Sequence, residues 1–280
     1  MNRFQRQIAF FGVEGQTKLQ DMVVGIVGVG GIGSHVVQQL ALLGVRSMVV
    51  IDDDELSESN TNRLIGFMFA DKPGTPKVDI AERTARQIDQ SIAVLKIKNI
   101  VNSKEAIDAL LKCNFVFGCV DNDGARLFLN EFCLAYAIPF IDSASEIKAG
   151  SPDFGGRVVS IIDEPGCLYC MNEISLKEAS KFLATPEARK DQELIYGVNA
   201  AAFQNSGPSV VTLNGIIASL ATTEFLVHVT EQRKINKKIT YYGAQGVVRK
   251  NSDSPQHDCY YCKTVRGSGK SANVERYLSR

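Results

Sequence analysis

The sequence predicts an α/β fold: a Rossmann-like, mostly parallel sheet with helices on both faces, and a small C-terminal part attached to it. Three observations predict it. Apolar strand-like runs alternate with helix-like runs from residue 23 to residue 142, and a glycine-rich turn joins the first strand to the first helix. Two Cys-x-x-Cys pairs then stand where the alternation has ended, at 167–170 and 259–262. A chain of 280 residues is long enough for one large α/β domain.

The glycine-rich turn, residues 28–34, reads GVGGIGS and follows an apolar run at 23–27 that predicts a strand. The run 32–43 predicts a helix, and 47–51 predicts a second strand, so the three form a βαβ unit. The glycines have the G-x-G-x-x-G spacing that lets backbone approach a phosphate, and the helix N-terminus adds free N–H groups. We therefore predict nucleotide binding by Gly28, Gly30, Gly31 and Gly33.

Polar residues follow the second predicted strand. Asp52 stands where an acid usually holds a ribose hydroxyl, and residues 55–63 form a polar loop that opens into a short helix. Because ligands lie at the carboxyl ends of parallel strands, we expect Asp52, Asn60 and Arg63 to converge on the glycine-rich turn. The turn alone does not identify the nucleotide. No Gly-Lys-Ser/Thr accompanies it, so it is not a Walker-type phosphate loop.

The alternation continues after a proline- and glycine-rich break at residues 73–76. We predict helices at 3–20, 77–90, 103–112 and 124–137, and strands at 93–100, 115–120, 139–142, 157–162 and 239–242. Residues 172–207 are polar and irregular, which predicts a crossing segment or lid. The small, polar and basic residues after 262 predict flexibility. The predicted organisation is therefore one domain, 1–262, and a flexible polar tail, 263–280.

Composition excludes several classes of protein. Hydrophobic residues make up 45% and charged residues 22%, which is ordinary for a globular enzyme. Lys+Arg and Asp+Glu are both 31, so no excess positive charge favours nucleic acid. The first six residues lack the apolar core of a signal peptide, and the apolar run 209–229 contains Asn214, Glu224 and His228, which favours a buried helix over a membrane span. We expect a cytoplasmic protein that binds neither nucleic acid nor membrane.

Four of the seven cysteines form the two Cys-x-x-Cys pairs. Such cysteines could also be small hydrophobic residues of the core or form a redox pair. Two Cys-x-x-Cys pairs, however, match a closed structural zinc site with four thiolates. His257 could compete as a ligand. The predicted zinc ligands are Cys167, Cys170, Cys259 and Cys262. The other three thiols lie in apolar contexts and are interpreted as core residues: Cys113, Cys119 and Cys133.

The motifs also occur in a recognisable order. They are Arg3-Phe4-Gln5-Arg6-Gln7, GVGGIGS, Asp52-Asp53-Asp54, Ser59-Asn60-Thr61-Asn62-Arg63, Pro76-Lys77, Cys119-Val120-Asp121-Asn122 with Arg126, the two cysteine pairs, and Asn214-Gly215. This ordered set, over residues 3–262, resembles the ThiF/MoeB/HesA group, the bacterial relatives of ubiquitin-activating enzymes. The resemblance implies ATP-dependent adenylation of a carboxylate with release of pyrophosphate. The acceptor is usually the C-terminal glycine of a ubiquitin-like protein; a sulfur-carrier protein or a peptide are the other choices.

The resemblance also assigns roles to residues. It implies that Asp52 and Asp54 lie at the nucleotide, that Asn60 and Arg63 line the phosphates, and that Arg6 reaches into the partner's site across a homodimer. The chemistry agrees, since phosphate charge needs cations and Mg²⁺ prefers oxygen ligands. The predicted catalytic residues are Arg6, Arg63, Lys77 and Asp121, and the nucleotide contacts add Asp52, Asp54, Asn60 and Asn122 to the glycines.

Asp121 could instead cap the helix that follows, and both roles hold together if Asp121 binds the metal and Asp123 caps the helix. Arg126 is interpreted as a structural ion-pair partner rather than a catalytic residue.

One departure from the family limits the reaction. Many relatives have a further cysteine in the crossing segment, but this chain has none between Cys170 and Cys259. We therefore expect an acyl-adenylate without an enzyme thioester, which a downstream conjugating or sulfur-transfer protein would consume. Two alternatives remain open: an NAD-dependent oxidoreductase, for which the three histidines are badly placed, and a catalytically silent relative that only binds a partner.

Overall fold

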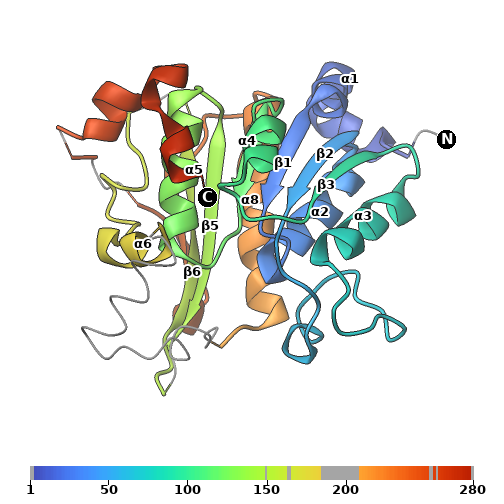
Figure 1. The fold of residues 1–280 in the computed structure, drawn as a ribbon. Coiled ribbons are helices and arrows are strands. Elements are labelled where there is room, and N and C mark those ends of the chain that lie inside the picture. The colour runs from blue at the N-terminus through green and yellow to red at the C-terminus, as the bar shows by residue number, and fades with distance from the viewer. Residues whose placement is uncertain are drawn as a thin grey trace.

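A computed structural model describes residues 3–148, 150–162, 165–183, 208–251, 255–256 and 258–278. These residues contain eight strands: β1 (Val23–Val27), β2 (Ser47–Ile51), β3 (Ala93–Ile97), β4 (Phe115–Gly118), β5 (Phe140–Ile147), β6 (Phe154–Ile161), β7 (Lys238–Tyr242) and β8 (Val247–Lys250). They form one sheet in the order β3-β2-β1-β4-β5-β6-β7-β8. The first five strands of that order are parallel, and the last three are added antiparallel (Figure 1). The predicted α/β fold is confirmed.

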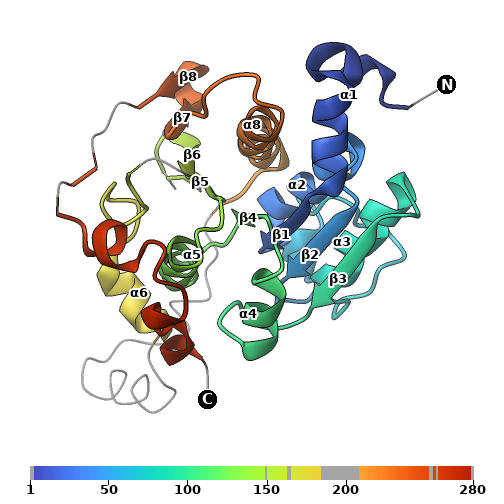
Figure 2. The ribbon, with the colours of Figure 1, turned by 90° about the horizontal axis from the view of Figure 1, so that it is seen from above.

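Helices cover both faces of the sheet. They are α1 (Gln5–Asp21), α2 (Gly31–Leu43), α3 (Lys77–Ile88), α4 (Lys104–Leu110), α5 (Asp123–Ala135), α6 (Leu176–Leu183) and α8 (Val211–Val229), with a 3-10 turn, η1 (Glu58–Asn60), after β2. One hydrophobic cluster joins α1, α2, α3 and α8 to the sheet, and a second joins α4 and α5 to its other face. Figure 2 shows α1 and α8 on one side of the sheet and α4, α5 and α6 on the other.

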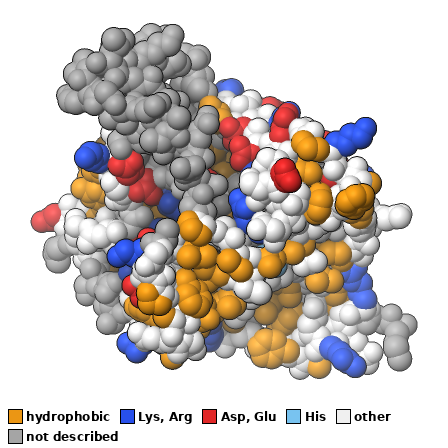
Figure 3. All heavy atoms as spheres, turned by 90° about the horizontal axis from the view of Figure 1, so that it is seen from below, with side chains coloured by type: hydrophobic (Ala, Val, Ile, Leu, Met, Phe, Trp, Pro, Cys, Tyr) orange, Lys and Arg blue, Asp and Glu red, His pale blue; other side chains and the backbone are white. Residues whose placement is uncertain are grey.

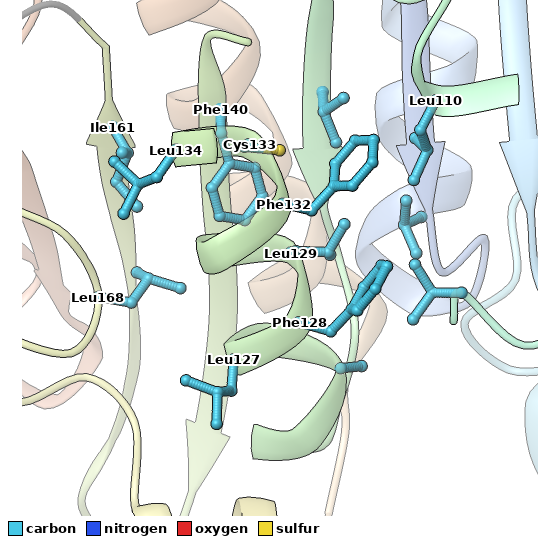
Figure 4. Close-up of a cluster of buried hydrophobic side chains, with 14 of the residues drawn as sticks. Leu110, Leu127, Phe128, Leu129, Phe132, Cys133, Leu134, Phe140, Ile161 and Leu168 are labelled. Atoms are coloured by element: carbon cyan, nitrogen blue, oxygen red, sulfur yellow. The ribbon is translucent and has the colours of Figure 1, made fainter. Parts of the chain in front are cut away.

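Helix α5 is the centre of the second cluster, because nearly all of its residues are buried. Phe128 and Phe132 stack with ring centroids 5.8 Å apart. Figure 4 shows these two rings directed toward Leu110, whereas Leu127 points toward Leu168. The helix is apolar on all sides because it packs both on the sheet and under the later part of the chain.

Two polar side chains of α5, Asn130 and Glu131, are fully buried, and their oxygens have partners. Asn130 accepts a hydrogen bond from the backbone N–H of Leu168 at 2.9 Å. Glu131 pairs with Arg276 and accepts a hydrogen bond from the Tyr277 hydroxyl at 2.7 Å. Buried polar groups without such partners would destabilise the fold, so these contacts attach the later segments to α5.

The segment after the second cysteine pair is packed against α5 rather than loose. It forms three short turns, η4 (Tyr261–Val265), η5 (Gly269–Ala272) and η6 (Val274–Tyr277), and it buries Val265 and Val274. The predicted flexible tail is therefore wrong for residues 263–278. The few apolar side chains of this segment are not spaced with the period of a helix or a strand, so the sequence does not reveal that it packs. The pairing of Glu131 with this segment is also invisible in the sequence, because it arises only when α5 is buried.

Helix α8 is long and apolar enough to cross a membrane and is alone in this among the described helices. It nevertheless packs on α2 and on β5 and β6 as a core helix. Its buried Glu224 pairs with Arg233 at 2.5 Å and accepts a hydrogen bond from the backbone N–H of Asn236 at 2.7 Å. The predicted buried helix is confirmed.

Three other elements differ from prediction. β8 and α6 were not expected, and β5 runs five residues beyond the predicted strand end at 142, to Ile147. β5 continues through polar residues because β6 pairs with it along its whole length. Of the predicted crossing segment at 172–207, residues 184–207 lie outside the described residues.

Candidate active site

The carboxyl ends of the parallel strands open onto a cleft of about 1170 Å³. Figure 3 views the molecule from below Figure 1, where the long loop after β2 lies, and shows basic, acidic and apolar side chains side by side on this face. Ten of the predicted site residues line the cleft: Gly28, Gly30, Gly31, Asp52, Asp54, Asn60, Arg63, Lys77, Asp121 and Asn122. The structure thus brings together residues from three separate connections, those that follow β1, β2 and β4.

The glycine-rich turn needs glycine at two positions for steric reasons. Gly28 has φ of 82°, and a Cβ there would lie 2.7 Å from the carbonyl oxygen of Cys119. A Cβ on Gly33 would lie 1.9 Å from the carbonyl oxygen of Gly28. Gly33 therefore packs the turn and does not line the cleft. The N-cap of α2 is Gly30, which has no side chain to cap the helix. The first N–H groups of α2 are therefore available to a phosphate.

Asp52 is buried at the end of β2. Its Oδ2 accepts a hydrogen bond from the N–H of Val29 at 2.7 Å, and its Oδ1 accepts one from the N–H of Asp54 at 2.9 Å. Burial raises the pKa of Asp52 to about 6, although the charge of Lys77 and the two N–H groups lower it. Each carboxylate oxygen keeps a lone pair, so Asp52 can fix the turn and still accept a ribose hydroxyl.

This raised pKa predicts a pH dependence of stability. The unfolded chain releases the Asp52 proton near 3.8 and the folded chain near 6, so the free energy of unfolding falls as pH rises between these values, by at most about 3 kcal/mol. Urea unfolding of nucleotide-free protein at pH 4 and 7 should show this loss. Asp52→Asn should flatten the dependence and Asp153→Asn, on an exposed loop, should not. An unchanged slope in Asp52→Asn contradicts the assignment.

Two cations lie on the phosphate side of the cleft. Lys77 begins α3 and is 7% exposed, and its Nζ lies 2.5 Å from Oδ2 of Asp54. Arg63 donates to the carbonyl oxygen of Ser59 and lies half-buried at the cleft. Lys77 and Asp54 therefore form a pair at the cleft wall, and Arg63 approaches from the loop after η1.

Asn60 lines the cleft but also stabilises its own turn. Its Oδ1 accepts hydrogen bonds from the N–H of Ser57 at 3.1 Å and from the Ser57 hydroxyl at 2.9 Å. The amide NH₂ group is therefore the part of Asn60 that can contact a phosphate.

The loop after β4 places Asp121 at the cleft, exposed. Asn122, not Asp123, caps α5 by accepting the N–H of Ala125 at 2.8 Å, so the predicted capping by Asp123 is wrong. Asp123 instead pairs with Arg126 at 3.1 Å. Arg126 also lies 3.5 Å from the buried Asp142, which confirms its interpretation as a structural ion-pair residue. Asp121 remains available to a cation.

Sequence reasoning missed a group of charged residues at the other end of the cleft. Asp142 on β5 is fully buried and pairs with Arg157 on β6 at 2.5 Å. Arg157 also pairs with Glu173, and Lys238 lies 2.6 Å from Glu173. The only sequence signal was an acid following an apolar strand, which does not identify its partners.

The four predicted zinc ligands meet in space, although Cys167 and Cys259 are 92 residues apart in sequence. Their Sγ atoms all lie within 4.8 Å of one another. Cys167 and Cys259 are 3.7 Å apart, and Cys170 and Cys262 are 3.8 Å apart. Four sulfurs at the usual zinc distance of 2.3 Å lie about 3.8 Å apart in a tetrahedron, so the cluster fits zinc. His257 lies outside the described residues.

Arg6 is exposed on α1 and does not line the cleft of its own chain. It is therefore the one predicted catalytic residue that the single chain does not bring to the site.

Comparisons with known proteins match the stretch of chain that contains these site residues. The ThiF family model matches residues 4–263. The sulfur carrier protein ThiS adenylyltransferase of Escherichia coli is 31% identical over 60% of this chain and 66% of its own length. The SAMP-activating enzyme E1 of Haloferax volcanii is 29% identical over 61% of this chain and 62% of its own length. The molybdopterin-synthase adenylyltransferase of Escherichia coli is 33% identical over 62% of this chain and 69% of its own length. The match thus spans slightly under two thirds of the first two relatives.

Solved structures support the fold. A crystal structure of Escherichia coli MccB with ATP superposes with a TM-score of 0.74 over 94% of this chain and 74% of that chain, at 18% identity. A crystal structure of PaaA gives a TM-score of 0.67 over 89% and 81%, at 21% identity.

Proposed function

The chain belongs to the ThiF family, and on that basis we propose that it is an adenylyltransferase that uses ATP to adenylate a carboxylate and releases pyrophosphate. The carboxylate is the C-terminal glycine of a ubiquitin-like protein, a sulfur-carrier protein or a peptide. The observation that carries the proposal is the convergence of Asp52, Arg63, Lys77 and Asp121 on the free N-terminus of α2 in one cleft. The relatives named above as adenylyltransferases support it.

These residues can divide the work of the reaction. Asp52 accepts a hydrogen bond from a ribose hydroxyl. The N-terminus of α2, together with Arg63 and Lys77, neutralises the negative charge of the phosphates. The substrate carboxylate then attacks the α-phosphorus, a new P–O bond forms, and the bond to pyrophosphate breaks. Mg²⁺, when bound, supplies further positive charge to the phosphates, and the exposed carboxylate of Asp121 is the group that would hold it.

The four cysteines have a different role in this proposal. A closed site with four thiolates leaves no position for substrate, so the zinc stabilises the fold and takes no part in the chemistry. We place the protein in the cytoplasm.

ATP–pyrophosphate exchange tests the proposal. Purified protein should exchange labelled pyrophosphate into ATP when Mg²⁺ and a candidate ubiquitin-like or sulfur-carrier protein are present, and it should bind ATP rather than NAD. Binding of NAD alone would support the oxidoreductase. Binding of neither nucleotide would support the silent, partner-binding relative.

The reaction should stop at the adenylate, because no cysteine lies between Cys170 and Cys259 to accept the acyl group. A downstream conjugating or sulfur-transfer protein would then supply the nucleophile. A gel-shifted adduct that disappears with reductant would contradict this and direct attention to Cys119, which lines the cleft.

We further propose a homodimer in which Arg6 completes the partner's site, and predict that Arg6→Ala lowers exchange on the order of tenfold or more without unfolding the protein. Arg249→Ala, on exposed β8, is the matched control. Mixing Arg6→Ala chains with Lys77→Ala chains is the sharper test. Mixed dimers contain one site with both groups, so activity should return in roughly a quarter of the sites. No recovery on mixing, or a fully active monomer, would refute the shared site.

A further inference from the structure

The first cysteine pair, Cys167 and Cys170, is followed by a carboxylate that reaches the cleft. The N–H of Glu173 donates to the carbonyl oxygen of Leu168, inside the cysteine pair, at 2.8 Å. The side chain of Glu173 is 9% exposed and lines the cleft. The position of this carboxylate therefore depends on the fold of the cysteine pair, which a bound zinc fixes.

Arg157 joins this carboxylate to the buried Asp142. Its Nε contacts the Glu173 carboxylate, its Nη2 donates to the Glu173 carbonyl oxygen at 3.2 Å, and its Nη1 donates to Asp142 at 2.5 Å. Removing one partner from a buried ion pair leaves an uncompensated charge, which is strongly destabilising. Arg157 and its two acids therefore keep their positions as a unit.

Arg126 continues this chain of ion pairs to the loop after β4, residues 119–122, here called the Asp121 loop. The Nη2 of Arg126 donates to the carbonyl oxygen of Val120 at 2.7 Å, directly before Asp121. The side chain of Arg126 is only 11% exposed, so this contact is well shielded from water. Arg126 thus orients the backbone that carries the Asp121 carboxylate.

Among these contacts, the one between Arg126 and Asp142 is the longest. The Nε of Arg126 lies 3.5 Å from Oδ1 of Asp142, and both atoms are buried without a hydrogen-bond partner among the described residues. Two such atoms gain energy by closing to hydrogen-bond distance. A small shift on either side of this contact therefore changes its energy, and two alternative arrangements of one contact can transmit coupling between sites.

A second connection runs beside the first. Asp123 pairs with Arg126 at 3.1 Å, and its other carboxylate oxygen accepts the N–H of Ser175 at 2.8 Å. Ser175 belongs to the segment that follows the first cysteine pair. Both connections therefore lead from that segment to Arg126.

We propose that Arg157 and Arg126 are positioning residues that couple the four-cysteine site to the Asp121 loop, so that zinc and Mg²⁺·ATP each strengthen the binding of the other. The inference rests on the proposed adenylation, in which Asp121 would hold the Mg²⁺. Zinc fixes the segment that ends at Glu173, and the two arginines pass this position on to the loop through their shared partner, Asp142. Coupling between two binding equilibria is reciprocal, so each ligand changes the affinity for the other by the same factor.

Equilibrium competition for zinc measures this coupling. Calorimetry on zinc-loaded wild-type protein first gives the dissociation constants for AMP and for ATP with excess Mg²⁺. The protein is then titrated with the zinc chelator pyridylazoresorcinol, with each nucleotide present at the same multiple of its own dissociation constant. General stabilisation of the folded chain is then equal for the two nucleotides. Mg²⁺·ATP should raise the affinity for zinc about fivefold or more beyond the effect of AMP, because AMP alone does not load the Asp121 loop.

Two conservative substitutions break the connection at different points. Arg157→Lys and Arg126→Lys keep the positive charge but lose the fork that reaches two partners, so each should reduce the extra effect of Mg²⁺·ATP to less than about twofold. Both variants should bind AMP like the wild type. The double variant should behave like either single variant, because the two arginines act on one connection.

Arg233→Lys is the matched control for these variants. Arg233 forms a forked pair with the buried Glu224, and neither residue lines the cleft. The substitution therefore removes a similar fork outside the connection, and it should keep the full effect of Mg²⁺·ATP on the affinity for zinc.

The outcomes separate the coupling from the proposed function. If Mg²⁺·ATP binds but raises the affinity for zinc no more than AMP does, or if both arginine variants keep the full effect, the coupling is overturned and adenylation stands. Loss of the effect in Arg233→Lys as well would assign it to general stability and would also overturn the coupling. If Arg157→Lys does not fold, Arg126→Lys decides alone. If neither nucleotide binds the wild type, the proposed function itself fails, and the coupling fails with it.

Discussion

Lys77→Ala and Asp121→Ala should each lower ATP–pyrophosphate exchange on the order of a hundredfold or more, with little change in ATP affinity for Lys77→Ala. Negative charge builds on the phosphates as the carboxylate attacks, so a fixed cation stabilises the transition state more than the bound substrate. Lys77 is suited to this because its buried ammonium group is held 2.5 Å from Asp54 at the cleft wall. Asp121→Ala should also remove the dependence of the residual rate on Mg²⁺ concentration.

Two nearby substitutions serve as controls. Lys96→Ala removes a lysine that pairs with Asp79 and Glu82 outside the cleft, and Asp108→Ala removes an exposed acid that pairs with Lys104 on α4. Both should exchange at nearly the wild-type rate. Circular dichroism and thermal unfolding should show that all four variants are folded. If Lys77→Ala and Asp121→Ala exchange pyrophosphate at the wild-type rate, the assignment of these residues to the site is wrong.

The largest effect on stability should come from the cysteine cluster. Cys170→Ser should abolish zinc binding and lower the free energy of unfolding by about 4.7 kcal/mol, the value for a cross-link closing a loop of about a hundred residues. The pairs joined here are 92 residues apart in sequence. Elemental analysis and urea unfolding measure the two outcomes, and a strong chelator should reproduce the stability loss in the wild type.

Cys133→Ala is the control, because Cys133 is a buried thiol in α5 far in sequence from both cysteine pairs. It should keep one zinc per chain and lose only the stability expected of a small core truncation. Purified wild-type protein without zinc, or Cys170→Ser protein with a full zinc content, would refute the metal site.

Local patterns were sufficient for the nucleotide half of the cleft. The predicted strands at 23–27 and 47–51 match β1 and β2 to the residue, and the helix after the glycine-rich turn begins one residue earlier than expected. These elements are short, apolar and bounded by glycine or aspartate, so their limits are visible in the sequence. Asp52 then follows from the rule that ligands lie at strand ends, whereas Lys77 was predicted through the resemblance to the family.

The β5 end of the cleft could not be predicted in the same way. Asp142 and Arg157 meet because β5 and β6 pair antiparallel with Ala144 opposite Arg157, a register that no local pattern encodes. Arg6 is a different case, because its proposed role depends on a second chain. The packing of Val274 against α5 was missed because a single apolar residue in a polar segment does not form the repeating pattern that indicates a helix or a strand.

The buried Glu131 in α5 has a consequence for the timing of folding during synthesis. Its partners in the described part of the chain, Arg276 and Tyr277, are 145 and 146 residues further along. At ribosomal speeds of roughly 5–20 residues per second, α5 waits roughly 7 to 30 seconds for them. During that interval a nascent chain can assemble β1 to β5 but must keep this carboxylate hydrated. The sheet can therefore form while translation continues, whereas the final seating of α5 follows synthesis of residue 277.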